Sequence, residues 1–126
     1  MPKVKVYIGL DKGAMMEKFN PEHKAVIDDM LLGHPLIRAG KMFGYPAYYV
    51  GRKLCICLYE QGVGIKVPQK TAEHLLDTDP NIISFQPLGK PKMREWILIN
   101  LDDSQGYRGY HSIFEEAIQY ILKLKS

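Results

Sequence analysis

The sequence of 126 residues lacks any long hydrophobic run. No stretch approaches the roughly 20 apolar residues that a membrane-spanning helix needs. The first residues, MPKVKVYIGLDKG, lack both a long apolar core and the small-residue cleavage site of a secretory signal. We therefore expect a cytoplasmic protein that does not bind membranes.

Phosphate-binding motifs are also absent, although the segment 41–68, KMFGYPAYYVGRKLCICLYEQGVGIKVP, is rich in glycine. A phosphate loop needs its glycines between a strand and the first turn of a helix, and neither GxxxxGK[ST] nor GxGxxG occurs in the chain. Here the glycines separate strand-like runs at 45–50, 54–59 and 63–67. These short spacings predict tight hairpins rather than a nucleotide site.

The sequence contains only two cysteines, Cys55 and Cys57. A structural zinc site needs about four ligands, and the four histidines stand singly in the sequence. Cys55 and Cys57 are two positions apart in a strand-like run. Their thiols are therefore expected to face one side of the sheet, while Ile56 faces the other. We therefore expect buried free thiols and neither a metal nor any other cofactor.

The chain also lacks a recognisable catalytic motif. His111 and Glu115 stand at helical spacing, and Asp102 and Asp103 follow a strand-like run. Carboxylates at the ends of strands and helices commonly serve as caps, and no serine or cysteine lies in a nucleophile elbow. We therefore expect that the protein is not an enzyme, and an enzyme with an unrecognised site is the second alternative.

The sequence does contain a clear order of helix and strand signals. Asn20-Pro21-Glu22 begins a helix that runs to about residue 32, where Gly33 ends it. After the three strand-like runs come a short helix at 70–77, a strand at 93–102 and an amphipathic helix at 110–124. This grouping predicts one α+β domain over 1–126, with an antiparallel sheet in two layers, helices on one face, and an extra edge strand within 1–12.

Positive charge is concentrated in one part of the chain, although the net charge is only +3. Residues 38–70 carry one acid, Glu60, and six basic side chains, which are Arg38, Lys41, Arg52, Lys53, Lys66 and Lys70. This excess favours either an anionic partner or a solvated surface that keeps sheet edges soluble.

The strands at 54–58 and 93–101 carry large residues on both faces, and three helices comfortably cover only one. The second face is expected to show Cys55, Cys57, Tyr59, Arg94, Trp96 and Leu98. Loops or the N-terminal strand cover this face, or it forms an interaction surface. In the second case we expect a homodimer with Trp96 as its central contact. Our candidate interaction residues are Tyr48, Arg52, Lys53, Lys66, Arg94 and Trp96.

A family resemblance begins at Met42-Phe43-Gly44. This run, the Tyr-rich strand, Gly51-Arg52 and the next hydrophobic strand resemble the TfoX N-terminal domain family. Further similarity lies at Ile65-Lys66-Val67 and Met93-Arg94-Glu95-Trp96, and the resemblance covers about residues 20–124. It implies a fold like that of secretion chaperones, a relation to regulators of competence for DNA uptake, and no established catalytic residues. Met42 and Phe43 are expected to enter the core, and Gly44 is expected to permit a bulge or a close backbone approach.

Together these observations predict a small non-catalytic interaction or regulatory protein of the TfoX N-terminal type, with a possible protein partner. The alternative is a nucleic-acid-associated domain that uses the basic, aromatic segment 41–68. In that interpretation Tyr48, Tyr49 or Trp96 would stack on bases.

Overall fold

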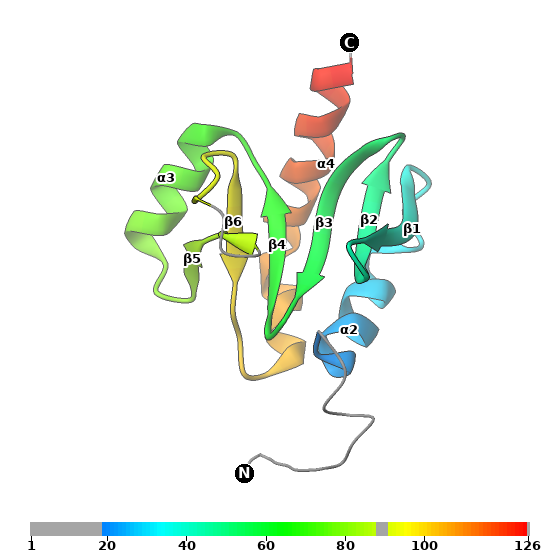
Figure 1. Ribbon diagram of the computed structural model, residues 1–126, viewed down its shortest axis with the longest axis horizontal. Helices are drawn as coiled ribbons and strands as arrows, with labels where there is room; N and C mark the ends of the chain where they lie inside the picture. Colours follow the sequence, from blue (N-terminus) through cyan, green and yellow to red (C-terminus); the bar gives the residue numbers. More distant parts are fainter. Residues whose placement is uncertain (1–18, 88–90, 126) are drawn as a thin grey trace.

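The computed structural model describes residues 19–87 and 91–125, which form an α+β fold around an antiparallel sheet of six strands (Figure 1). The predicted edge strand within 1–12 lies outside these residues. In chain order the elements are α2 (Pro21–Leu31), β1 (Ile37–Met42), β2 (Tyr45–Val50), β3 (Lys53–Tyr59), β4 (Gly62–Lys66), α3 (Gln69–Thr78), β5 (Ile82–Ser84), β6 (Trp96–Ile99), the 3-10 helix η3 (Ser104–Tyr110) and α4 (His111–Lys125). The predicted fold class and order of elements are confirmed.

The strands lie in the order β1-β2-β3-β4-β6-β5. Two-residue turns join β1 through β4, and the backbone at Phe43, Gly44, Gly51 and Glu60 has positive φ, as tight hairpin turns of this kind need. The hairpins predicted at Gly51 and Gly62 are confirmed. Strand β1 was not predicted, and Gly44 lies in its turn with β2 rather than at a bulge.

The predicted helix at 21–32 is confirmed as α2, and its start follows from the sequence. The side chain of Asn20 accepts hydrogen bonds from the backbone N–H groups of Glu22 and His23. The predicted strand at 93–102 is wrong at both ends, because only Trp96–Ile99 is extended. A turn precedes it, in which the N–H of Trp96 donates to the carbonyl of Met93.

The main core joins side chains of α2, α3, α4 and η3 to one set of strand residues. Helix α4 passes behind the sheet in Figure 1, and it contributes Phe114, Ala117, Ile118 and Ile121. The strands contribute Ile56, Leu58, Val63, Ile65, Ile97 and Ile99. This alternation of core residues with residues of the second face is the period of two that a pleated sheet imposes.

A bulge in β3 changes the direction of one cysteine. Tyr48 pairs with Ile56 while Tyr49 pairs with Leu54, so Cys55 is an extra residue between the two pairs. Cys55 therefore packs in the main core together with Ile56, whereas Cys57 belongs to a separate cluster. The prediction that both thiols face one side was wrong for this reason.

Small residues form a row across four strands on the second face of the sheet. The strand register places Gly40 beside Ala47, Ala47 beside Cys57, and Cys57 beside Gly64. The ring of Phe85 packs directly on this row, because a Cβ atom added to Gly64 would lie 2.8 Å from Cε2 of Phe85. Gly64 thus permits a close side-chain approach, and this is the structural reason for a glycine within β4.

We predict that Gly64→Ala lowers the free energy of unfolding by about 1–3 kcal/mol, because the methyl group would overlap the buried Phe85 ring. Urea denaturation measures this change. Gly33→Ala is the matched control, since nothing lies within 4 Å of its added Cβ. Equal denaturation midpoints for the two variants would contradict the packing argument.

Candidate interaction site

The second face of the sheet carries its own apolar cluster. Ala47, Cys57, Phe85 and Trp96 are buried in it. Three ring pairs link the cluster: the ring centroids lie 4.8 Å apart for Tyr45 and Tyr59, 5.4 Å for Tyr59 and Phe85, and 5.6 Å for Phe85 and Trp96. Phe85 and Met93, which lie between β5 and β6, pack in this cluster, so residues outside the strands cover part of this face, as one of the two predictions held.

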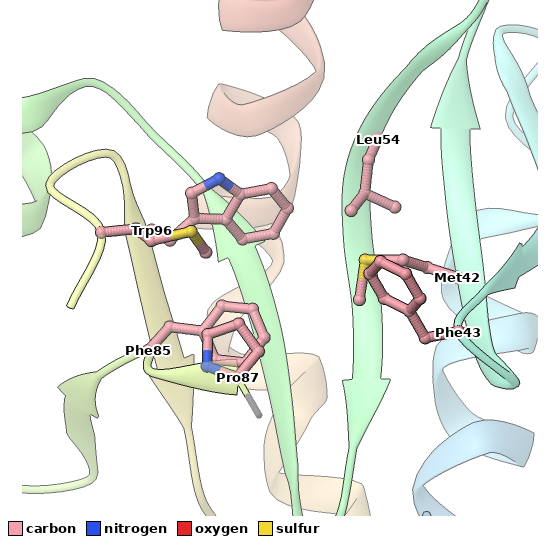
Figure 2. Close-up of a pocket in the computed structure, with 7 residues that line it drawn as sticks. Met42, Phe43, Leu54, Phe85, Pro87 and Trp96 are labelled. Carbon is pink, nitrogen blue, oxygen red and sulfur yellow. The ribbon is translucent and has the colours of Figure 1, made fainter. Parts of the chain in front are cut away.

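A pocket of about 220 Å³ remains open beside this cluster. Figure 2 shows Phe85, Pro87 and Trp96 on one side and Met42, Phe43 and Leu54 on the other. Met93 completes the lining, so the lining side chains are predominantly apolar. The two methionines have flexible, polarisable side chains that adapt to the shape of an apolar occupant.

Phe43 is the most exposed lining residue, with 67% of its surface open to solvent. Its φ of 52° lies in the left-handed region, and the following Gly44 has a φ of 85°. Turns of this geometry favour Asn-Gly, and a bulky residue there carries backbone strain. The prediction that Phe43 enters the core was wrong, because the turn carries its ring outward, while Met42 is partly buried in the second-face cluster. Phe43 therefore combines backbone strain with an exposed aromatic ring.

The six predicted interaction residues are not brought together. Tyr48 is only 1% exposed, and its hydroxyl donates to Asp28, so it offers no surface contact. Trp96 is 8% exposed and lines the pocket. The Nζ atom of Lys66 lies 5.8 Å from the centroid of the Trp96 ring and 3.1 Å from Oε1 of Glu95. The other three lie elsewhere: Arg52 and Lys53 line a hollow with Leu124 of α4, and Arg94 lines one beside α3.

Sequence reasoning missed most of the pocket, namely Met42 and Phe43 as lining residues, Leu54, Phe85, Pro87 and Met93. These residues come from four separate parts of the chain. The one local signal was Phe43-Gly44 directly before the strand-like run at 45–50, since a two-residue turn with positive φ carries the Phe43 side chain away from the core.

The edge of β1 is partly closed to strand pairing. In a two-residue hairpin the backbone groups of Ile37 and Lys41 point away from β2. The N–H of Ile37 donates to the carbonyl of His34 at 3.1 Å, and the Tyr49 hydroxyl donates to the carbonyl of Lys41 at 2.7 Å. These bonds occupy groups that a further strand would use, so the pocket is a better candidate for binding than this edge.

The structure shows the surroundings of the two cysteines and of Asp103. Burial raises the pKa of Cys55 and of Cys57 to about 12, so both are neutral thiols near pH 7. The carboxylate of Asp103 accepts from the N–H of Gln105, which confirms the predicted capping role. Within residues 19–87 and 91–125, no three His, Cys, Asp or Glu side chains gather as metal ligands.

His23 is the one buried histidine in the described part of the chain, with 1% exposure. Its Nδ1 lies 3.2 Å from the hydroxyl of Tyr107, which also contacts the carbonyl of Ile99 at 3.3 Å. Burial lowers the pKa of His23 below its usual value, although the nearby carboxylates of Glu22 and Asp102 act in the opposite direction. The contact thus joins α2 to η3 through a neutral imidazole.

Comparison with known proteins gives no relative: no family model, no curated protein and no solved structure matches the chain. The resemblance to the TfoX N-terminal domain therefore stays a prediction. Within the described residues, no helix has the length and apolar character needed to cross a membrane.

We predict that Phe43→Asn raises the free energy of unfolding by about 1 kcal/mol, because Asn tolerates the left-handed region better than Phe does. Glu60→Asn is the matched control, since Glu60 has a φ of 53° and does not line the pocket. Thermal or urea denaturation measures both variants. A clear loss of stability for Phe43→Asn alone would mean that the Phe43 ring contributes to the fold.

We also predict that stability decreases as the pH falls from 7 towards 5, and that this decrease is smaller in His23→Gln. Above pH 6.5 His23 is neutral in both the folded and the unfolded chain. Below 6.5 the unfolded chain binds a proton that the folded chain, with its lowered pKa, binds only at still lower pH. Urea denaturation at pH 5, 6 and 7 tests this, and an equal pH dependence in both proteins would remove His23 as the cause.

Proposed function

We propose that the chain is a non-catalytic interaction protein that binds a protein partner through the pocket on the second sheet face. One observation carries this proposal: a predominantly apolar pocket whose rim holds Phe43, 67% exposed on a strained turn. Among its lining side chains only the indole of Trp96 has a polar N–H group, so the pocket mainly provides apolar surface for a contact.

The size of the pocket supports an anchoring contact. Its volume of about 220 Å³ is below the roughly 300–1,000 Å³ of typical small-molecule sites, so one large side chain matches it better than a cofactor does. Burying such a side chain contributes roughly 1.5–3 kcal/mol. A few anchors of this kind commonly supply most of the binding energy of an interface.

We further propose a regulatory protein of the TfoX N-terminal type that acts in the cytoplasm. The support is the antiparallel α+β fold and the position of Met42-Phe43-Gly44 at the first hairpin. The two-layer arrangement with helices on one face and the similarity to secretion chaperones stay predictions. Homodimer formation also stays a prediction. Because Trp96 is only 8% exposed, a dimer contact would have to use Phe43 and its neighbours instead.

A nucleic-acid-associated domain is the second candidate. It is favoured by the hollow that Arg52 and Lys53 line, and by Arg38, whose guanidinium carbon lies 5.1 Å from the ring centroid of Tyr49. It is weakened because Tyr48 and Trp96, two of its proposed stacking groups, are buried. Binding of labelled single-stranded DNA that falls steeply with salt would favour this candidate.

We predict that partner proteins co-purify from the native host with the wild type and with Glu60→Asn, and that Phe43→Asn loses them. Quantitative mass spectrometry of the three samples measures the effect. The expected loss is at least fivefold, because Phe43 forms one side of the pocket. Equal recovery by all three proteins would contradict binding through this face.

A further inference from the structure

We infer that the pocket accepts an acidic segment of the partner protein, in which carboxylates flank one phenylalanine or large aliphatic side chain. This inference rests on the proposed function and adds the chemistry of the partner. The apolar pocket calls for the anchor, and the charges that surround it call for the acidic flanks.

Basic residues dominate the parts of the chain that build the pocket. All seven lining residues come from segments 38–70 and 85–96. The first segment carries six basic side chains against Glu60, and the second carries three against Glu95. Glu95 already pairs with Lys66 at 3.1 Å, and Arg52 and Lys53 line a separate hollow, so only part of this positive excess lies at the pocket.

Several of these cations lie on the same face as the pocket. Lys66 follows Gly62 and Gly64 in the alternation of β4, and its Nζ lies over the Trp96 ring. Arg38 lies over Tyr49, which belongs to the second-face cluster. Lys92 and Arg94 are exposed and flank the lining residue Met93, and together with Met93 and Glu73 they line the neighbouring hollow beside α3. Among described residues, no carboxylate forms an ion pair with Arg38, Lys92 or Arg94.

This charge disfavours two other occupants. A second copy would bring the same basic residues of two protomers together, and like charges across an interface oppose association. The strand-like segment 3–8, KVKVYI, carries Lys3 and Lys5, so it would meet the same repulsion. An acidic partner instead gains attraction, which also speeds its encounter with the pocket.

A nucleobase fits the pocket less well than an apolar side chain. A base carries several polar edge groups, and among the lining side chains only the indole N–H of Trp96 could pair with them, so most of these groups would be buried without hydrogen-bond partners. A phenylalanine or leucine side chain has no such groups. The observations therefore favour a peptide over a nucleic acid.

The test uses Trp96, the single tryptophan of the chain, as a reporter within the pocket. Four synthetic peptides are compared: EDEEFEDEE, the same peptide with alanine in place of phenylalanine, a neutral version SNQSFSNQS, and a basic version KKKKFKKKK. We expect EDEEFEDEE to shift the Trp96 emission and to bind at least tenfold more tightly than the other three. Its affinity should fall with added salt, because salt screens the charge attraction.

Variants locate the binding. Phe43→Asn is expected to weaken EDEEFEDEE at least fivefold, whereas Glu60→Asn does not weaken it. Double replacement of Lys92 and Arg94 by Gln is expected to bring its affinity close to that of the neutral peptide. Far-UV circular dichroism of each variant checks that the fold is retained.

The contrary outcomes are distinct. Equal binding of the acidic, neutral and basic phenylalanine peptides would overturn the acidic partner but leave the proposed function standing. If no peptide binds while the Phe43-sensitive co-purification holds, the acidic partner is again overturned. If no peptide binds and the co-purification does not depend on Phe43, both the acidic partner and the proposed function are overturned. Three further results would each assign the pocket to another occupant and overturn the inference: a dimer lost in Phe43→Asn, tighter peptide binding after removal of residues 1–18, and Phe43-dependent DNA binding.

Discussion

The packing of the Phe85 ring on Gly64 is the contact on which the second face of this protein depends. Gly64 continues a row of small residues across the sheet, and the missing side chain lets Phe85 lie close to the backbone of β4. Phe85 then contacts Tyr59 on one side and Trp96 on the other. Because these rings fill only part of the face, the pocket remains beside them, with Met42 and Phe43 across from Phe85.

The β1–β2 turn supplies the other side of the pocket, and it does so against local preference. A turn with two positive φ values is most stable with Asn-Gly, and this chain has Phe43-Gly44. The Phe43 ring gains little from the fold, since two thirds of it is exposed. The proposed contact of Phe43 with a partner protein would explain this combination, and an acidic partner would explain the basic residues near the pocket.

Much of the fold could be predicted because its signals are local. The cap at Asn20 and the turns at Gly51 and Gly62 identify a helix and the hairpins from neighbouring residues. Strand β1, IRAGKM, lacks large alternating side chains and was missed. The bulge at Cys55 arises from the pairing of β3 with β2, which a single strand does not reveal. The pocket joins residues 42–43, 54, 85–87, 93 and 96, so it exists only after the sheet has formed.

Binding of an acidic segment in the pocket can be tested by methyl NMR. The protein is labelled at its methionine methyl groups and titrated with the peptide EDEEFEDEE. Met42 and Met93 line the pocket, whereas Met30 packs against the main core and is an internal control. The Met42 and Met93 signals are expected to shift in a saturable way while the Met30 signal does not. Saturable binding that leaves Met42 and Met93 unshifted would rule out binding in the pocket, since the peptide would then bind elsewhere.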